Sequence, residues 1–179
     1  MSSPETVFGV SLATYTLVHV LISLVGIGSG LVVLFGLVAA KRLERWTALF
    51  LATTVATSVT GFGFPFEHLL PSHKVGILSL VVLAVSILAR YPLHLAGAWR
   101  AVYVVCATLA LYFNVFVAVV QAFLKVPALK AMAPHQTEPP FVVAQGVVLA
   151  VFVVLGIVAA IRFRVEAAGS GRPGMGKVA

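Results

Sequence analysis

Long apolar stretches, each closed by charged or turn-forming residues, constrain this sequence more than any other feature. They cover residues about 15–40, 46–64, 73–89, 99–124 and 141–161. A helix of about 20 apolar residues crosses the hydrocarbon core of a bilayer and satisfies its own backbone hydrogen bonds there. Only 9% of the residues are charged, against roughly 25% in soluble domains. The sequence therefore predicts an all-α integral membrane bundle of five transmembrane helices, and it excludes an ordinary soluble domain.

The two ends of the chain differ from this pattern. Residues 1–162 are predicted to form the transmembrane domain, and the glycine-rich residues 163–179 a disordered cytoplasmic tail. At the other end, Ser2, Pro4 and Glu5 are typical of a helix start, because they supply an N-cap, a first-turn proline and a first-turn acid. We therefore expect the first helix to begin near Pro4.

The basic residues are distributed unevenly between the two sides that alternating helices would create. Three lie on the side of the N-terminus: Lys74, Lys125 and Lys130. The other nine of the 12 lie on the opposite side: Lys41, Arg42, Arg45, Arg90, Arg100, Arg162, Arg164, Arg172 and Lys177. Lys and Arg accumulate on the cytoplasmic side of membrane proteins. We therefore predict an N-out/C-in protein of the cell inner membrane whose partner is the lipid bilayer, and the net charge of +7 does not indicate nucleic-acid binding.

The first apolar stretch carries small and polar residues on one helical face. His19, Ser23, Gly26 and Gly30 are spaced i, i+4, i+7 and i+11, and Gly26 and Gly30 form a GxxxG pair. Glycines at this spacing let a neighbouring helix approach closely. We predict a helix-packing seam at Ser23, Gly26 and Gly30, and two interpretations of His19 remain open: a hydrogen-bonded packing residue, or part of a ligand or proton site.

The fourth stretch carries a second polar stripe. Asn114, Gln121 and Lys125 are spaced i, i+7 and i+11 and so share one helical face. The predicted topology puts Gln121, Gln145 and His19 at a similar depth near the outer surface. Polar groups are costly when they face lipid. We therefore expect these five side chains to line a small-molecule pocket in the outer half of the bundle.

Two cofactor sites compete with this pocket. Haem b requires axial ligands on facing helices, and His19 with a second histidine is the candidate pair. A metal site is the other alternative, because imidazole and carboxylate groups suit zinc. Its candidate ligands are His68, His73 and His135, with Glu67 and Glu138 on the same side.

Enzymatic chemistry has little support in the sequence. It contains no nucleophile elbow, HExxH or P-loop motif. It also contains no Asp, and its five glutamates all lie near the termini or in loops. Ion-coupled transporters, by contrast, use a carboxylate near the membrane midplane. This pattern favours a non-enzymatic accessory subunit or a small-ligand binder, with a haem b or quinone-interacting redox protein as the alternative.

Two runs of the chain carry a resemblance. They are V-G-I-G-S-G-L-V-V-L-F-G-L near the start and F-N-V-F-V-A-V-V-Q-A-F-L-K-V-P-A-L-K-A-M-A-P-H-Q-T-E-P-P-F in the second half. With them the chain resembles an uncharacterised family of small multi-pass bacterial inner-membrane proteins. The resemblance implies a multi-pass membrane bundle from a bacterium, and it assigns no activity. The partners left open are other membrane subunits or further copies of the chain in a homo-oligomer.

Overall fold

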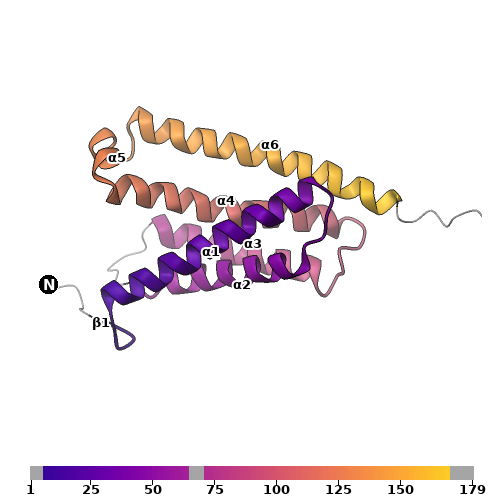
Figure 1. The fold of residues 1–179 in the computed structure, drawn as a ribbon, viewed down its shortest axis with the longest axis horizontal. Coiled ribbons are helices and arrows are strands. Elements are labelled where there is room, and N and C mark those ends of the chain that lie inside the picture. Colours follow the sequence, from indigo (N-terminus) through magenta and orange to yellow (C-terminus); the bar gives the residue numbers. More distant parts are fainter. Residues whose placement is uncertain (1–5, 65–70, 170–179) are drawn as a thin grey trace, which may run out of the picture.

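The computed structural model describes residues 6–64 and 71–169 and is a helical bundle (Figure 1). A small hairpin precedes the helices, and five of the six helices are long. The elements are β1 (Thr6–Val7), β2 (Val10–Ser11), α1 (Leu12–Val38), α2 (Glu44–Gly61), α3 (Pro71–Arg90), α4 (Trp99–Lys125), α5 (Pro127–Met132) and α6 (Pro139–Gly169).

Four of these helices are long and apolar enough to cross a membrane. The segments are Leu12–Val38, His73–Arg90, Trp99–Lys125 and Pro139–Phe163. The chain is therefore a multi-pass membrane protein by length and composition. The fifth long helix, α2, has 18 residues and is less apolar, because five of them are threonine. Some of these hydroxyl groups form their hydrogen bonds within the helix. Thr53 and Thr60 each donate to the carbonyl four residues earlier at 2.7 Å.

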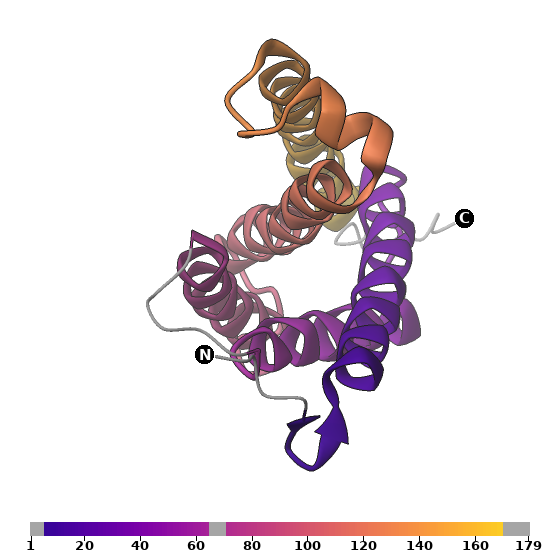
Figure 2. The same ribbon diagram turned by 90° about the vertical axis from the view of Figure 1, so that its left-hand side faces the viewer.

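The long helices run in alternating directions between two ends of the bundle. The hairpin end carries β1 and β2, the ends of α2 and α4 and the starts of α1, α3 and α6 (left in Figure 1). The arginine end carries Arg90 and the opposite helix termini. Figure 2, viewed from the hairpin end, shows α1, α2, α3 and α4 arranged in a ring, with α6 outside it against α4.

The apolar core is concentrated towards the arginine end. Its buried side chains come from all five long helices and, at Leu95, from the loop between α3 and α4, and nearly all lie between the middle of the bundle and that end. They are Val33, Leu34, Leu37, Phe50, Leu51, Leu83, Ala89, Leu95, Tyr103, Val104, Ala107, Ala110, Leu111, Phe152, Ala159 and Phe163.

A buried arginine closes the core at the arginine end. The Arg90 side chain is only 4% exposed and forms an ion pair with Glu44 at the start of α2. Its guanidinium carbon lies 5.2 Å from the ring centre of Tyr103 on α4, within cation–π distance. Arg90 therefore joins α2, α3 and α4 at one point.

The N-terminal helix start that the sequence predicts near Pro4 is wrong for the described residues. Thr6 pairs with Ser11 and Val7 with Val10, around a two-residue turn in which Phe8 (φ 51°) and Gly9 (φ 79°) both have positive φ. Such turns match the twist of a hairpin. α1 begins at Leu12, where the Ser11 hydroxyl accepts from the Thr14 N–H at 3.2 Å.

The predicted disordered tail also begins too early. α6 continues to Gly169, so residues 163–169 are helical, and residues 170–179 lie outside the described part of the chain. The segment after Phe163 is rich in Arg, Glu and Ala, which have high helix propensity, and extending an existing helix costs little compared with starting one.

Candidate functional site

The half of the bundle near the hairpin end has a different character from the core. Residues 112–120 of α4 are all half-buried rather than sorted into a buried and an exposed face. Figures 1 and 2 show α1 and α4 farther apart at the hairpin end than at the arginine end. The predicted site residues His19, Asn114, Gln121, Lys125 and Gln145 all belong to this half.

His19 on α1 is bonded to the last turn of α2. Its Nδ1 atom lies 2.8 Å from the Thr60 hydroxyl oxygen, and that oxygen lies 2.7 Å from the Ala56 carbonyl oxygen. A carbonyl has no proton, so the single hydroxyl proton of Thr60 has to lie between these two oxygens. Thr60 therefore accepts from Nδ1–H, and neutral His19 keeps an unprotonated Nε2 that can accept a further hydrogen bond.

Aromatic side chains surround His19 on this side. The Phe64 ring meets the imidazole edge-on, with ring centres 5.1 Å apart, and it meets Tyr15 in the same way at 5.1 Å. The Tyr15 hydroxyl donates to the Thr60 carbonyl at 2.7 Å. We call His19, Tyr15, Thr60 and Phe64 the His19 site.

Sequence reasoning missed three members of this site. By pattern alone, Thr60 indicates helix packing, Phe64 the membrane boundary and Tyr15 the start of a span. The sequence G-F-G-F at residues 61–64 could have indicated this contact, because its glycines leave room for a side chain of another helix. A side chain at Gly63 would collide with the Tyr15 hydroxyl.

Asn114 lies at the centre of the bundle. Its Nδ2 atom donates to the Thr54 hydroxyl of α2 at 3.4 Å, and a Cβ at Gly26 of α1 would stand 3.3 Å from the same Nδ2. Asn114 therefore faces both α1 and α2. The Ser23 hydroxyl, by contrast, donates to the His19 carbonyl at 2.7 Å, which is a hydrogen bond within α1.

Gly30 lies where α1 approaches both α2 and α4 closely. A Cβ there would stand 2.5 Å from Leu111 on α4 and 2.8 Å from the Phe50 ring on α2. The two glycines of the predicted helix-packing seam therefore differ in their surroundings, because Gly26 lies against polar side chains and Gly30 against apolar ones.

The stripe on α4 does not stay inside the bundle as predicted. Gln121 and Lys125 are exposed, whereas Asn114 is half-buried and faces α1 and α2. The reason is that α1 diverges from α4 towards the hairpin end, so the same helical face loses its partner.

Gln145 lies at a different helix contact from His19. It is 9% exposed, and its Nε2 donates to the Phe116 carbonyl of α4 at 3.1 Å. Gln136 donates in the same way to the Val120 carbonyl at 2.9 Å. These two amides attach α6 and the segment before it to α4.

The predicted convergence of Gln145 with His19 does not occur. Phe116, whose carbonyl accepts from Gln145, is two residues from Asn114, so the two positions face nearly opposite sides of α4.

The predicted metal ligands are also separated. His73 is buried with its ring centre 5.5 Å from that of Phe62, while His135 is exposed and its backbone N–H donates to Glu138. His68 lies outside the described residues. Within residues 6–64 and 71–169, no three His, Cys, Asp or Glu side chains come together in a way that could hold a metal ion.

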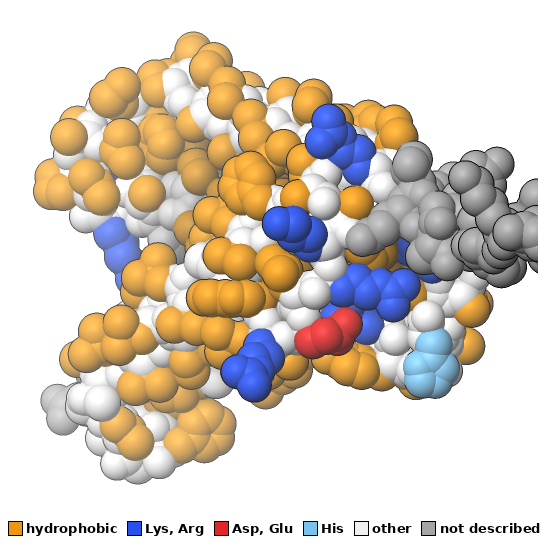
Figure 3. All heavy atoms as spheres, turned by 45° about the vertical axis from the view of Figure 1, so that its right-hand side comes forward, with side chains coloured by type: hydrophobic (Ala, Val, Ile, Leu, Met, Phe, Trp, Pro, Cys, Tyr) orange, Lys and Arg blue, Asp and Glu red, His pale blue; other side chains and the backbone are white. Residues whose placement is uncertain are grey.

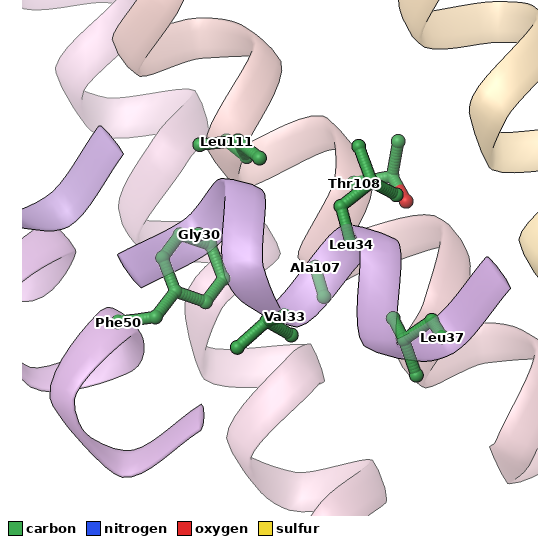
Figure 4. A pocket seen from close by; sticks show the side chains of 8 residues that line it. All are labelled: Gly30, Val33, Leu34, Leu37, Phe50, Ala107, Thr108 and Leu111. Carbon is green, nitrogen blue, oxygen red and sulfur yellow. The ribbon is translucent and has the colours of Figure 1, made fainter. Parts of the chain in front are cut away.

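An apolar pocket lies in the other half of the bundle (Figure 4). It is too narrow to admit a water molecule, and Thr108 carries the one polar side chain among the residues that line it. It is a packing gap beside Gly30. The residues lining it are Gly30, Val33, Leu34, Leu37, Phe50, Ala107, Thr108 and Leu111.

Comparisons with protein families, with curated proteins and with solved structures find no match for this chain. The resemblance drawn from the sequence therefore stays a prediction, and function has to be inferred from the geometry alone.

Proposed function

We propose that the chain crosses a cell inner membrane five times, with its N-terminus outside and its C-terminus in the cytoplasm. Two spans, α1 and α3, both start at the hairpin end. The chain has to return to that end between them, and α2 is the segment that does so. The charge distribution supports the orientation, because Lys41, Arg42, Arg45, Arg90, Arg100 and Arg162 belong to the arginine end.

Reporter fusions test this orientation. Alkaline phosphatase, which is active only outside the cytoplasm, should be inactive when fused after Gly169 and active when fused before Ser2. The opposite result would reverse the orientation. Activity at both positions would exclude an odd number of spans.

We propose further that the protein is a non-enzymatic binder of a small ligand at the His19 site. The observation that carries this proposal is the hydrogen-bond chain from His19 through Thr60 to Ala56. It fixes the tautomer and leaves Nε2 as an acceptor that no described side chain uses. A ligand hydroxyl or N–H group would complete this bond, and the aromatic rings of Tyr15 and Phe64 would contact its apolar part.

Binding accounts for these groups better than catalysis does. The contacts of His19 among the described residues are a hydroxyl and an aromatic ring, and a general base is usually oriented by a group that can also stabilise its charged form. No carboxylate of the described residues contacts the imidazole. The site can therefore orient a ligand, but among the described residues no carboxylate supports the imidazole as a base.

The variant His19→Asn tests this proposal. The Asn amide can still donate to Thr60, but it offers nothing in place of Nε2. We expect small molecules that co-purify with the wild-type protein, detected by native mass spectrometry from nanodiscs of its host membrane, to be lost in His19→Asn. The variant should keep the melting temperature of the wild type, and Gln121→Asn on the exposed face should keep the ligand. Equal retention in both variants would refute the proposal.

A redox role is the second candidate. A neutral histidine with a free Nε2 is the form that ligates haem iron or accepts a hydrogen bond from a quinol. Haem b would give a Soret band in the purified wild type that His19→Asn abolishes. A co-purified quinone in the mass spectrum, lost in the same variant, would identify the ligand of the His19 site instead.

A further inference from the structure

The arginine end carries far more positive than negative charge. Figure 3 shows Lys and Arg side chains gathered around one acidic side chain on this face. Among the described residues of this end, Glu44 is the acid, and it forms an ion pair with the buried Arg90. The remaining cations of this end whose side chains are described have no ion pair with a described residue: Lys41, Arg42, Arg45, Arg100 and Arg162.

Arg100 differs from the other four because it is partly withdrawn from solvent. Its guanidinium carbon lies 5.9 Å from the ring centre of Phe163 on α6. Its Nε–H group is buried and donates to no described residue. A buried donor without a partner is costly, so the described residues satisfy this guanidinium only in part.

A second arginine lies at the same end of the bundle. Arg162 directly precedes Phe163 on α6 and is exposed, whereas the Phe163 ring that contacts Arg100 is buried. The two guanidinium groups come from different helices, α4 and α6. Arg100 also lies in the first turn of α4, where the helix dipole favours an anion.

Apolar surface continues directly from this pair. Ile157 and Ile161 on α6 are 55% and 60% exposed, and Trp99 at the start of α4 is 38% exposed. Tryptophan is enriched at the boundary between headgroups and acyl chains. An anion bound here would thus have apolar protein surface on its membrane side.

We propose that Arg100 and Arg162 bind the phosphate group of an anionic phospholipid, whose acyl chains lie along the exposed apolar face of α6. Guanidinium groups match phosphate oxygens with paired hydrogen bonds. A phosphate at this position would accept from the terminal N–H groups of the Arg100 guanidinium and would neutralise part of the charge that Glu44 leaves unbalanced. A free phosphate ion would use the arginines but not the apolar surface, so lipid is the better match.

Thermal unfolding of the delipidated full-length protein in a neutral detergent tests this site. We expect phosphatidylglycerol to raise the melting temperature by several degrees, and phosphatidylcholine and inorganic phosphate to have much smaller effects. The double variant Arg100→Gln/Arg162→Gln should lose the response to phosphatidylglycerol. The matched double variant Lys74→Gln/Lys130→Gln, at the hairpin end, should keep it.

Three outcomes would overturn the proposal. Equal stabilisation by inorganic phosphate would indicate a site for a free anion. An unchanged response in the arginine double variant would place the lipid elsewhere, and equal stabilisation by phosphatidylcholine would remove the role of charge. If the arginine variant does not fold, native mass spectrometry of the wild type decides, because preferential retention of phosphatidylglycerol over phosphatidylcholine is required. The Arg100→Lys/Arg162→Lys variant should then retain less phosphatidylglycerol than the wild type.

Discussion

The two halves of the bundle use the same helices in different ways. Towards the arginine end, Phe50, Tyr103 and Leu111 are at most 1% exposed, and Gly30 lets three helices meet. Towards the hairpin end, many side chains are half-buried, and hydrogen bonds such as those of Tyr15, His19 and Asn114 join the helices. Lipid is as apolar as leucine, so helix association in a membrane depends on close packing and hydrogen bonds. One half therefore supplies the stability, and the other keeps polar groups available.

The largest loss of stability is expected from a substitution that creates a cavity in the packed half near the arginine end. Phe50→Ala should destabilise the protein by on the order of 3 kcal/mol, because its neighbours cannot close the space. Phe116→Ala on α4, where the native side chain is half-buried, should cost clearly less. Unfolding followed by circular dichroism during titration with a denaturing detergent measures both. Equal losses would show that the hairpin half is as tightly packed as the core.

Overpacking the glycine contact should have the next largest effect. Gly30→Leu should cost about 1–3 kcal/mol, because its Cβ would already stand 2.5 Å from Leu111. Gly28→Leu is the matched control, since a Cβ at Gly28 meets nothing within 4 Å. The same unfolding measurement applies. A loss of stability in Gly28→Leu that equals the loss in Gly30→Leu would contradict the assigned helix contact.

Removing the acceptor of His19 should have a smaller effect. Thr60→Val keeps the side-chain shape but deletes the hydroxyl, and should cost about 1 kcal/mol, typical of one hydrogen bond. ¹⁵N NMR of the labelled imidazole in nanodiscs should show protonated Nδ1 and unprotonated Nε2 in the wild type, and a mixture of tautomers in the variant. A wild-type ring protonated at Nε2 instead would contradict a hydrogen bond donated by Nδ1–H to Thr60.

The smallest effects should come from the glutamines. Gln121→Leu replaces an exposed side chain and should leave stability unchanged within about 0.5 kcal/mol. Gln145→Leu should cost no more than about 1 kcal/mol, because the lost bond to Phe116 is offset by removing a buried carbonyl oxygen without a partner among the described residues. A loss near 3 kcal/mol in Gln145→Leu would mean that Oε1 has a partner, such as an ordered water.

Much of the architecture could be predicted from periodicity and composition. The predicted first span, residues 15–40, corresponds to α1 at Leu12–Val38, and the fourth, residues 99–124, to α4 at Trp99–Lys125. The hairpin before α1 could not be read in this way, because it depends on positive φ at Phe8, a residue that seldom adopts it.

The candidate site was less predictable than the helices. Helical spacing correctly places Asn114, Gln121 and Lys125 on one face, but it says nothing about how far the neighbouring helix follows that face. It could not show that α1 diverges before Gln121, or that Gln145 bonds to the far side of α4. Thr60, which fixes the tautomer of His19, is one of several threonines in α2 with the same local pattern.

The sequence by itself determined that this chain is a helical membrane protein, because a backbone in lipid has to satisfy its own hydrogen bonds and the apolar stretches are long enough to do so. Only the tertiary structure decided which polar side chains meet. Those pairings depend on the crossing geometry of helices that are distant in sequence, and that geometry follows from close packing at Gly30 and Arg90 rather than from any local pattern.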